Sequence, residues 1–457
     1  MLQSTSSNQQ IVNARILAEM AVQFNIGADI LGKGNRHVES KLGAENLSGD
    51  TVMVPIVDGG EVYDKLDLSG KDLSVARDAV PVTVKPLTTA AAISQEDLTL
   101  SIKNPEIMGK RVANMALTAS NMAVNCLEAN ALNATVINNA DITGAGAGYT
   151  GRSKLYDLVA LCEGSKLAGE TYGVVHPLVW AKLIAMFQGN YAPNDKVGNE
   201  LYKNELGELA GIRWTKTQLL KLITATAMSG NVSFDYATTM LNQAYYDVQA
   251  GNSVPSSQFN AGVSITNHVS FFGAGVIGDY KPGTLSQPFG LDSAEGNPIN
   301  STDIFGNDTG HRAVFHLVAV DTDGDGKSDS AVLAAPVFFE GPRTNVFCKD
   351  YVKVSDGGGK LENCVARNIL TNGQQYLPPA LVWKRDDFLV AVKGLEKYYG
   401  SDSLTIPTTY KDKNILPLRG WAWTDPERAR TLFRVDVLLG CAAYTRTSMN
   451  ALYIQAN

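Results

Sequence analysis

An acidic stretch from Asp321 to Asp329, D-T-D-G-D-G-K-S-D, has residue types at a spacing that could bind a metal ion. Oxygen-bearing residues fall at positions one, three, five, seven and nine of the pattern that wraps Ca²⁺. In order, they are Asp321, Asp323, Asp325, Lys327 (through its carbonyl) and Asp329. Gly326 falls at position six, where such a loop turns sharply. Hard oxygen ligands at alternate positions suit calcium, so these residues are a candidate structural calcium site.

We call residues 321–329 the acidic loop. The residues around this loop limit its interpretation as a calcium site. Position twelve is Val332 rather than the glutamate of an EF-hand, and the flanking runs V-F-H-L-V-A-V and A-V-L-A-A-P-V-F-F read as strands. A standard EF-hand is therefore excluded, and the loop resembles the calcium-binding hairpin loops of β-propeller blades. An ordinary Asp- and Gly-rich hairpin turn without a metal explains the same sequence equally well. Both alternatives give the loop a structural role.

The sequence predicts no catalytic centre. His311 and His316 are five residues apart, so on one strand they would face opposite sides and could not share a metal. The motifs G-x-S-x-G and H-E-x-x-H are missing, and the acidic pair at 386–387 is typical of a helix cap. The Gly-rich run at 138–151 lacks a phosphate-loop pattern and reads as a flexible linker. We therefore expect a protein that is not an enzyme and requires no cofactor, with structural calcium as the one candidate ligand.

The charge balance and the cysteines limit the class of protein. The chain has 46 acidic and 39 basic residues, which argues against a main role in gripping phosphate backbones but does not exclude enclosing nucleic acid. The five cysteines are widely spaced and form no C-x-x-C pair, as expected for reduced thiols in a cytosol. The N-terminal stretch is polar and no apolar run approaches about 18 residues, so neither secretion nor a membrane span is expected.

One unusually long helix is predicted from Asn104 to about Ala134. Asn104 can cap its free N–H groups, and Pro105 suits its first turn. Apolar residues at alternating spacings of four and three form one stripe along it. They are Met108, Val112, Met115, Ala119, Met122 and Cys126. At about 30 residues the helix would be about 45 Å long, much longer than the average globular helix.

The remaining segments alternate between helical and extended patterns. A helical arm is predicted at 8–24, with Ile16, Met20 and Phe24 near one face. Two β-rich runs at 51–57 and 79–93 are expected to form a long ribbon. Further along, the patterns predict helices at 152–170, from Pro177 and at 387–399, a strand at 172–176, and β-rich segments at 225–342 and near the end of the chain. Ending on strands implies that the C-terminal segment closes a sheet begun earlier.

Taken in order, these segments resemble tailed-phage major capsid proteins, close to the coat-protein family of the short-tailed Salmonella phage P twenty-two. D-T-V-M-V-P-I (50–56) and L-T-T-A-A-A-I-S-Q-E-D-L (87–98) resemble the two strands of that family's extended loop, and the long helix resembles its spine helix. G-P-R-T-N-V-F (341–347) resembles the exit of its inserted domain, where R-T-N-V-F is the closest identity. Residues 215–230 resemble the entry to that domain. Residues 381–392 resemble the family's terminal helix, and residues 433–444 resemble its closing strands.

The resemblance implies an α+β chain with a Hong Kong 97-type phage capsid fold and an inserted β domain. The implied parts are an N-terminal arm (1–45), an extended loop with flanking strands (46–98), a peripheral domain with the spine helix (99–145), the first part of an axial domain (146–224), the inserted β domain (225–342) and the remainder of the axial and peripheral domains (343–457). The match is poor between Phe234 and Asn307, so contacts of the insertion cannot be carried over. No residue pair aligns with the Lys–Asn cross-link of some relatives.

The implied function is that of a major capsid protein of the virion. Copies would form the hexamers and pentamers of an icosahedral head, assembled in the host cytoplasm with a scaffolding protein and a portal. The head would enclose double-stranded DNA without sequence-specific binding and without a membrane. One alternative is an encapsulin-like compartment shell, which the β insertion and the R-T-N-V-F match disfavour. Another is a calcium-dependent extracellular binding protein, which the missing signal peptide and the single acidic loop disfavour.

Overall fold

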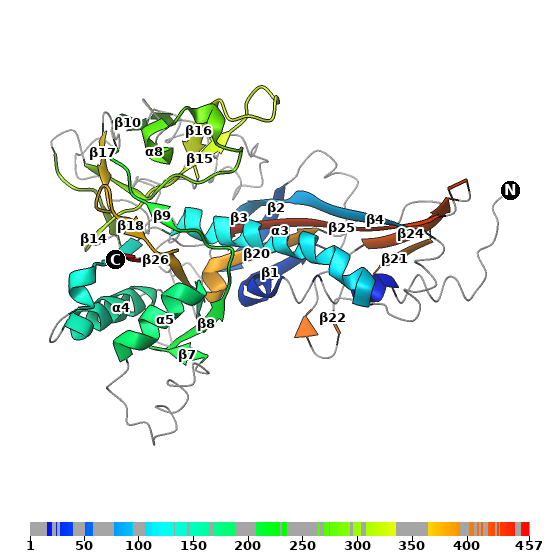
Figure 1. Ribbon diagram of the computed structural model, residues 1–457, viewed down its shortest axis with the longest axis horizontal. Coiled ribbons are helices and arrows are strands. Elements are labelled where there is room, and N and C mark those ends of the chain that lie inside the picture. The colour runs from blue at the N-terminus through cyan, green and yellow to red at the C-terminus, as the bar shows by residue number, and fades with distance from the viewer. Residues whose placement is uncertain are drawn as a thin grey trace, which may run out of the picture. The chain divides into compact units, whose positions relative to one another are not determined.

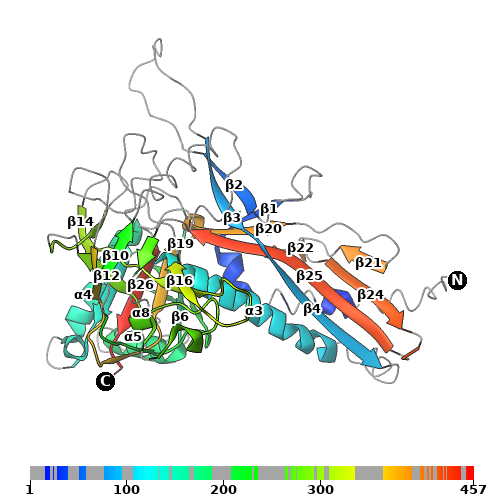
Figure 2. The ribbon, with the colours of Figure 1, turned by 90° about the horizontal axis from the view of Figure 1, so that it is seen from above.

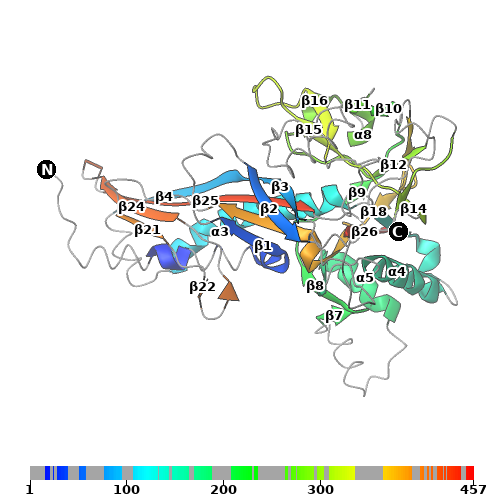
Figure 3. The same cartoon turned by 180° about the vertical axis from the view of Figure 1, so that it is seen from behind.

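A computed structural model of the chain describes residues 16–20, 24, 28–39, 51–57, 77–94, 106–131, 133–143, 147–163, 169–187, 207–228, 231–234, 263–265, 269–273, 275–292, 296–302, 308–334, 364–393, 402–405, 409–410, 413–414, 419–425, 427–428, 430–443 and 449–456. The chain divides into two compact units. Unit 1 consists of Met1–Val54, Pro81–Val124 and Leu389–Ala442, and unit 2 of Pro55–Val80, Asn125–Phe388 and Ala443–Asn457. Helices and strands are mixed within the chain (Figures 1 and 3), which confirms the α+β class.

Unit 1 is built on a six-stranded sheet. The strand order is β1–β20–β25–β24–β21, and β4 pairs with β25 beside that path. The strands are β1 (Asn35–Glu39), β4 (Lys85–Ser94), β20 (Phe388–Lys393), β21 (Asp402–Thr405), β24 (Arg419–Asp425) and β25 (Arg430–Ala443). Smaller elements are the 3-10 helix η1 (Asp29–Lys33) and the paired strands β22 (Thr409–Tyr410) and β23 (Lys413–Asn414). The sheet therefore joins three segments that are far apart in the sequence.

β25 is the central strand of this sheet, because β24 pairs with one of its edges and β4 with the other. The ladder to β4 joins ten consecutive residue pairs without a register shift, and Figure 2 shows the two strands running along each other. Alternate residues of β25 are buried, as the two-residue period of a strand requires. They are Phe433, Val435, Val437 and Leu439. The pairing confirms that a strand near the C-terminus closes a sheet begun early in the chain.

The predicted long helix is present as α3 (Glu106–Asn130). It ends earlier than expected, because the residues predicted to form its last turn instead begin the strand β5 (Asn133–Ile137). The Asn130 side chain donates to the carbonyl of Cys126 at 2.8 Å, a local contact that competes with continued helix. The proposed cap, Asn104, and Pro105 lie outside the described residues.

The buried face of α3 differs from the predicted stripe. Met115 and Ala119 are buried as expected, but Met122 and Cys126 are only half-buried. The other buried residues of its described part are Ala116, Ser120, Ala123, Val124, Leu127 and Ala129. Most of these side chains are small, so the backbone of neighbouring elements can approach the helix closely. Close packing of this kind, rather than the position of the largest apolar residues, therefore sets which face of α3 is buried.

Two sequence predictions for unit 1 have opposite outcomes. Residues 16–20 are helical, and Ile16, Met20 and Phe24 are buried, which confirms the described part of the arm. The predicted helix at 387–399 is wrong, because residues 388–393 form the strand β20. Its residues from Phe388 to Val392 are all buried, and such an apolar run cannot be assigned to strand or helix by periodicity alone. Residues 394–399 lie outside the described part.

Unit 2 contains a second six-stranded sheet, of order β5–β26–β19–β6–β8–β7. Besides β5, its strands are β6 (Thr171–Val175), β7 (Glu208–Leu209), β8 (Ile212–Lys216), β19 (Ala380–Lys384) and β26 (Met449–Ile454). The pairs β5–β26 and β6–β8 are parallel, and the others are antiparallel. The helices α4 (Ala147–Glu163) and α5 (Pro177–Phe187) pack together, and their apolar faces share one core with the sheet. β26 thus completes a sheet that begins at β5.

The segment before α4 corrects a prediction. The Gly-rich run at 138–151 was expected to be a flexible linker, but its described parts form the 3-10 helix η3 (Asn139–Asp141) and the first turn of α4; residues 144–146 lie outside the described part. Lys154 pairs with Asp141 at 2.7 Å, and a Cβ at Gly151 would lie 2.7 Å from the Met186 sulfur. These contacts fix a segment whose composition suggested freedom. The predicted strand at 172–176 and helix from Pro177 are confirmed, whereas the helix predicted at 152–170 begins earlier and does not include residues 169–170.

The rest of unit 2 is rich in short strands. A four-stranded sheet has the order β11–β10–β17–β12, with β10 (Asn231–Phe234), β11 (Val263–Ile265), β12 (Phe289–Asp292) and β17 (Cys364–Asn368). Three strand pairs are β9 (Ile223–Thr224) with β18 (Gln375–Tyr376), β13 (Asn300–Thr302) with β14 (Asp308–Arg312), and β15 (Leu317–Val320) with β16 (Ser330–Leu333). Short helical turns are α8 (Val269–Phe272), η5 (Ile277–Asp279) and η7 (Arg385–Asp387). In the core of this strand-rich part, Phe271 packs edge to face against Phe289 with ring centroids 4.8 Å apart, and the Phe289 and Phe315 centroids lie 5.9 Å apart.

The ribbon predicted from the runs at 51–57 and 79–93 is confirmed only in part. β2 (Thr51–Val57) and β3 (Arg77–Thr83) form a two-stranded sheet, but residues 85–93 of the second run lie in β4 and pair with β25 instead; residues 58–76 lie outside the described part. Cys126, Cys162 and Cys441 form no disulfide among the described residues. Among the described helices, each is too short or too polar to cross a bilayer.

Replacing Gly173 by alanine is expected to destabilise unit 2. Its Cβ would lie 2.5 Å from the Trp214 ring, and that ring is held in place by Trp180 and by an indole N–H bond to the Leu209 carbonyl. The strain should lower the free energy of unfolding by about 1–3 kcal/mol, measured by urea denaturation. Gly207→Ala is the matched control, because a Cβ there meets nothing within 4 Å, and it should change little. Equal stability of both variants would contradict the packing described.

Candidate functional site

The acidic loop connects the two strands of a hairpin. β15 and β16 pair antiparallel from Leu317↔Leu333 to Val320↔Ser330, so the flanking strands predicted from the sequence are confirmed. The Asp329 N–H donates to the Val320 carbonyl at 3.1 Å and closes the loop at its base. The loop is therefore a turn on a rigid strand pair rather than part of a helix–loop–helix.

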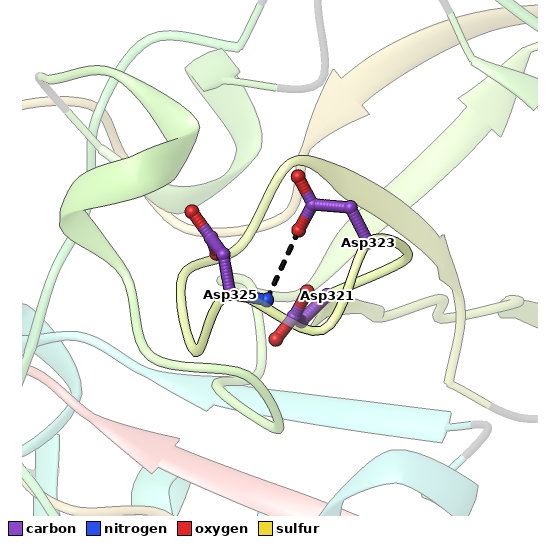
Figure 4. A group of neighbouring side chains, drawn as sticks. All are labelled: Asp321, Asp323 and Asp325. Carbon is purple, nitrogen blue, oxygen red and sulfur yellow. Dashed lines mark hydrogen bonds between the residues drawn. The ribbon is translucent and has the colours of Figure 1, made fainter.

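Carboxylates organise the backbone of this loop. The Asp321 carboxylate accepts the N–H groups of Gly324 and Gly326, each at 2.7 Å. The Asp323 carboxylate accepts the Asp325 N–H at 3.2 Å, which Figure 4 shows as a dashed line. Gly324 and Gly326 have φ of +80° and +85°, a conformation that favours glycine. The sequence therefore folds locally because side-chain acceptors and left-handed glycines act together.

Three of the predicted ligands come together. Asp321, Asp323 and Asp325 each offer a carboxylate oxygen, and these oxygens lie within 4.8 Å of one another. Asp321 is half-buried, and the other two are exposed. Converging carboxylate oxygens are the donor set that a hard divalent cation prefers. The residues present therefore fit calcium by chemistry, with water able to complete the coordination from the open side.

The pKa values of Asp321 and Asp323 shift in opposite directions. The backbone N–H of Gly326 lowers the pKa of Asp321. For Asp323 the hydrogen bond from the Asp325 N–H acts in the same direction, but the contact with Asp321, desolvation and the charges of Asp325 and Asp321 outweigh it and raise the pKa. Two neighbouring carboxylates are thus pushed apart in pKa, as expected when like charges share a small volume. A bound cation would remove that repulsion.

The other two predicted ligands are placed differently. Asp329 lies outside the group of three, and its carboxylate accepts hydrogen bonds from the Thr322 N–H at 3.1 Å and from the Thr322 hydroxyl. The Lys327 N–H donates to the Asp325 carboxylate at 2.7 Å. Asp329 thus pins the start of the loop to its end, a contact that the spacing pattern alone did not predict.

The spacing of His311 and His316 predicts that they do not share a metal ion. His316 is buried, and its Nδ1 lies 3.0 Å from the Ser286 carbonyl oxygen. His311 lies in β14, while His316 follows that strand. The structure therefore confirms His316 as a histidine held in the protein core. Arg385, Asp386 and Asp387, predicted to cap a helix, form the short turn η7 between β19 and β20.

A charged cluster in unit 2 was missed by the sequence analysis. Asp292 on β12 is nearly buried and pairs with Arg312 and with Arg367, the latter at 2.7 Å. A Cβ at Gly290 would collide with the Arg312 side chain, so glycine at that position makes room for the pair. Burial, and after it the charge of Arg367, lowers the pKa of Arg312. The three residues come from three separate strands, so no local spacing could have indicated the cluster.

A second group of titratable residues lies where α3 enters unit 2. Burial raises the pKa of Glu128 to about 7, and the charge of Lys221 offsets part of that rise. Burial, and then the charge of Glu128, raises the pKa of Tyr453 on β26 well above its usual value. Among the described residues, the Tyr453 hydroxyl has no hydrogen-bond partner. This group therefore affects stability and pH dependence.

Comparisons with known proteins give distant likenesses. No protein-family model matches the sequence, and no curated protein matches it. The chain is similar to a capsid structure of the cyanophage P-SCSP1u, with 10% identity, a TM-score of 0.39, and coverage of 92% of this chain and 86% of that one. The mature capsid of bacteriophage PhiM1 gives 10% identity and a TM-score of 0.39, over 93% of this chain and 87% of that one. A virus-like particle from Pyrococcus furiosus gives 7% identity and a TM-score of 0.37, over 96% and 98%. These values are too low to carry an argument for function.

Glu128→Gln is expected to change how stability depends on pH. A carboxyl whose folded-state pKa is about 7, above its usual value of 4.5, binds its proton more tightly in the folded state. The folded state therefore loses stability as the pH rises from about 4.5 to about 7, and the loss is complete above that range. The variant should unfold like the wild type at pH 5 and be about 1–3 kcal/mol more stable at pH 8 in urea denaturation. The exposed Glu208→Gln is the control, and parallel curves for wild type and Glu128→Gln would contradict the assignment.

Proposed function

We propose that this chain is a shell subunit, the major capsid protein of a tailed phage, related to the coat-protein family of phage P twenty-two. The observation that carries the proposal is the order of the resembling segments along nearly the whole chain, from D-T-V-M-V-P-I to F-R-V-D-V-L-L-G-C-A-A-Y. No single segment is diagnostic, and R-T-N-V-F at 343–347 lies outside the described residues. The Hong Kong 97-type fold with an inserted β domain belongs to this proposal.

The described elements occur in the order that the proposal requires. A strand pair (β2 and β3) and the long strand β4 precede a 25-residue helix, α3. A mixed α/β part and a strand-rich part follow, and β25 and β26 return to pair with β4 and β5. This succession of ribbon, long helix and closing strands supports a subunit whose elements span a shell rather than surround a catalytic cleft.

In the proposed role the function is geometric. Identical chains bury complementary surfaces and close with symmetry into hexamers and pentamers of an icosahedral head. A scaffolding protein and a portal would act during assembly, and the finished head would hold double-stranded DNA within the virion. The formal net charge of −7 supports enclosure without tight binding, since a basic inner surface would hold the phosphate backbone. The proposed role includes no chemical step.

We also propose that the acidic loop binds calcium as a structural ion. The converging oxygens of Asp321, Asp323 and Asp325 and the repulsion among them support this role. An ion there would stabilise the β15–β16 turn within unit 2 and would take no part in a reaction. A calcium-dependent extracellular binding protein remains the alternative from another class, and a cargo-loaded compartment shell the alternative within the fold.

Expression of the full chain together with a scaffolding protein from the same genome should give closed shells in negative-stain electron microscopy. Repeated subunit contacts, each weak, add up over a closed surface, so the shells should withstand dilution and size-exclusion chromatography. A protein that remains monomeric with and without the scaffold would contradict the shell role. The nucleic acid or protein cargo of shells purified from infected cells separates a phage head from a compartment.

Calcium should raise the Tm of the full chain in differential scanning fluorimetry. Binding to the folded state alone adds about 2.7 kcal/mol at a hundredfold excess over Kd, which corresponds to roughly 2–5 °C for a unit of this size. A chelator should reverse the shift, and Asp323→Asn should abolish it. Asp157→Asn, at an exposed position on α4, is the control and should keep the shift. A wild-type Tm that is equal in calcium and chelator would return the loop to a plain turn.

A further inference from the structure

The strand β4 has an edge that no described strand of the chain occupies. One edge pairs with β25 over ten residues, and the sheet order places no other described strand beside β4. The ladder has no register shift, so the strand is regular along its whole length. Among the described strands, the row of N–H and C=O groups on its second edge therefore has no partner strand.

The composition of β4 lacks the features that usually protect such an edge. Natural edge strands carry charges, prolines or bulges that prevent pairing with other chains. In β4 these features are limited to Lys85 and Pro86 at one end. The following eight residues, L-T-T-A-A-A-I-S, contain neither a charge nor a proline. The edge from Leu87 to Ser94 is thus open to a partner strand, while its N-terminal end is blocked.

The two faces of the sheet at β4 are distinguishable. Thr88, Ala90 and Ala92 are exposed, and by register they lie opposite Asp436, Arg434 and Leu432 of β25. The intervening positions, including the half-buried Leu87, lie opposite the buried residues Val437, Val435 and Phe433. From Leu87 onward, the exposed even-numbered positions therefore share one face, called the outer face, and the register assigns the odd-numbered positions to the other, inner face. A strand added to the edge must keep this alternation, or its side chains would sit on the wrong face.

We propose that β4 pairs antiparallel with β4 of a second copy of this chain, about a two-fold axis that is perpendicular to the sheet and passes midway between the two copies of Ala90. The pairing rests on the proposed shell role and gives it one specific contact between subunits. It would join two sheets into one continuous sheet across the axis. Such an isologous contact uses the same surface on both copies and closes on itself.

The register follows from the faces and the charges. In a symmetric antiparallel pair about Ala90, position 88 stands opposite position 92, and 87 opposite 93. Outer positions then meet outer positions, and the apolar Leu87 meets Ile93. The neighbouring symmetric register, centred on Thr89, would keep the faces but set the charged Lys85 opposite Ile93. Registers centred between residues would pair odd with even positions and turn one sheet over. Centring on Ala90 or on Ala91 pairs only uncharged residues within β4, so no like charges meet across the contact. Of these two registers, only the one centred on Ala90 sets Leu87 opposite another residue of β4, which is why we propose it.

Cysteine cross-linking tests this register directly. In the full chain, Ala90→Cys would place the same residue of both copies opposite each other, with Cα atoms about 4.5–5.5 Å apart, a distance that a disulfide spans. Ala92→Cys is the matched control, because it is exposed on the same face but its two copies would be about 13 Å apart, four residues along the strand. Under mild oxidation, Ala90→Cys should give a covalent dimer on a non-reducing gel, while Ala92→Cys and the wild type, with its native cysteines, should not.

The outcomes separate this proposal from the shell role. Shells that form without an Ala90→Cys dimer would overturn the strand pairing and leave the shell role intact. Equal dimer formation by both variants would also overturn it, because the contact would then lack the register. A wild-type chain that never assembles would overturn the shell role, and the same gel on the free protein would still decide the pairing.

Hydrogen exchange on the wild-type chain gives a second test that needs no substitution. In dissociated subunits, alternate amides of β4 should exchange slowly because they bond to β25, and the intervening amides should exchange fast. In the assembled protein, both sets should become slow. Intervening amides that are already slow in the free subunit would show that another segment of the same chain covers the edge. Amides that stay fast after assembly would show that the edge remains open. Either result would overturn the proposal.

Discussion

The regular pairing of β25 on both of its edges is the constraint on which unit 1 depends. Its alternate residues are buried, so the register to β4 and β24 cannot slip by one residue without moving Phe433, Val435 and Val437 to the opposite face. One strand near the C-terminus thereby fixes the place of segments that begin at Lys85 and Arg419. Such long-range pairing is slow to form, because the loops must close before the contacts are gained.

In unit 2 the corresponding constraint is the compensation of carboxylate charges. Its acidic loop holds three carboxylates close together, and the backbone N–H groups of Gly324 and Gly326 compensate only one of them. Elsewhere in the same unit, Asp292 is compensated by two arginines, and burial raises the pKa of Glu128 to about 7. The carboxylates of the acidic loop are therefore both accessible to solvent and incompletely compensated. A cation from solvent can stabilise a turn under these two conditions.

The proposed shell role connects two features that would be unusual in a lone globular protein. One is a 25-residue helix whose buried face consists mainly of small residues, and the other is an uncharged sheet edge. An unprotected edge is a hazard for a soluble monomer, because it can pair with any exposed strand. In a subunit that is meant to meet copies of itself, the same edge can serve as a contact. The physical basis of the role is thus in the backbone as much as in the side chains.

Local patterns in the sequence determined the elements whose signals are complete within a few residues. They gave the long helix, the strand at 172–176, the helix from Pro177 and the hairpin that carries the acidic loop, together with the spacing of Asp321, Asp323 and Asp325. Tertiary structure decided what depends on residues far apart in the chain: the strand β20, which its apolar run could not distinguish from a helix, the regular structure at 139–141 and 147–151, and the Asp292 cluster. It also decided which face of α3 is buried and that Asp329 bonds to Thr322. The reason is physical, because periodicity reports one element's preference, whereas burial and charge pairing are set by the neighbours that folding brings to it.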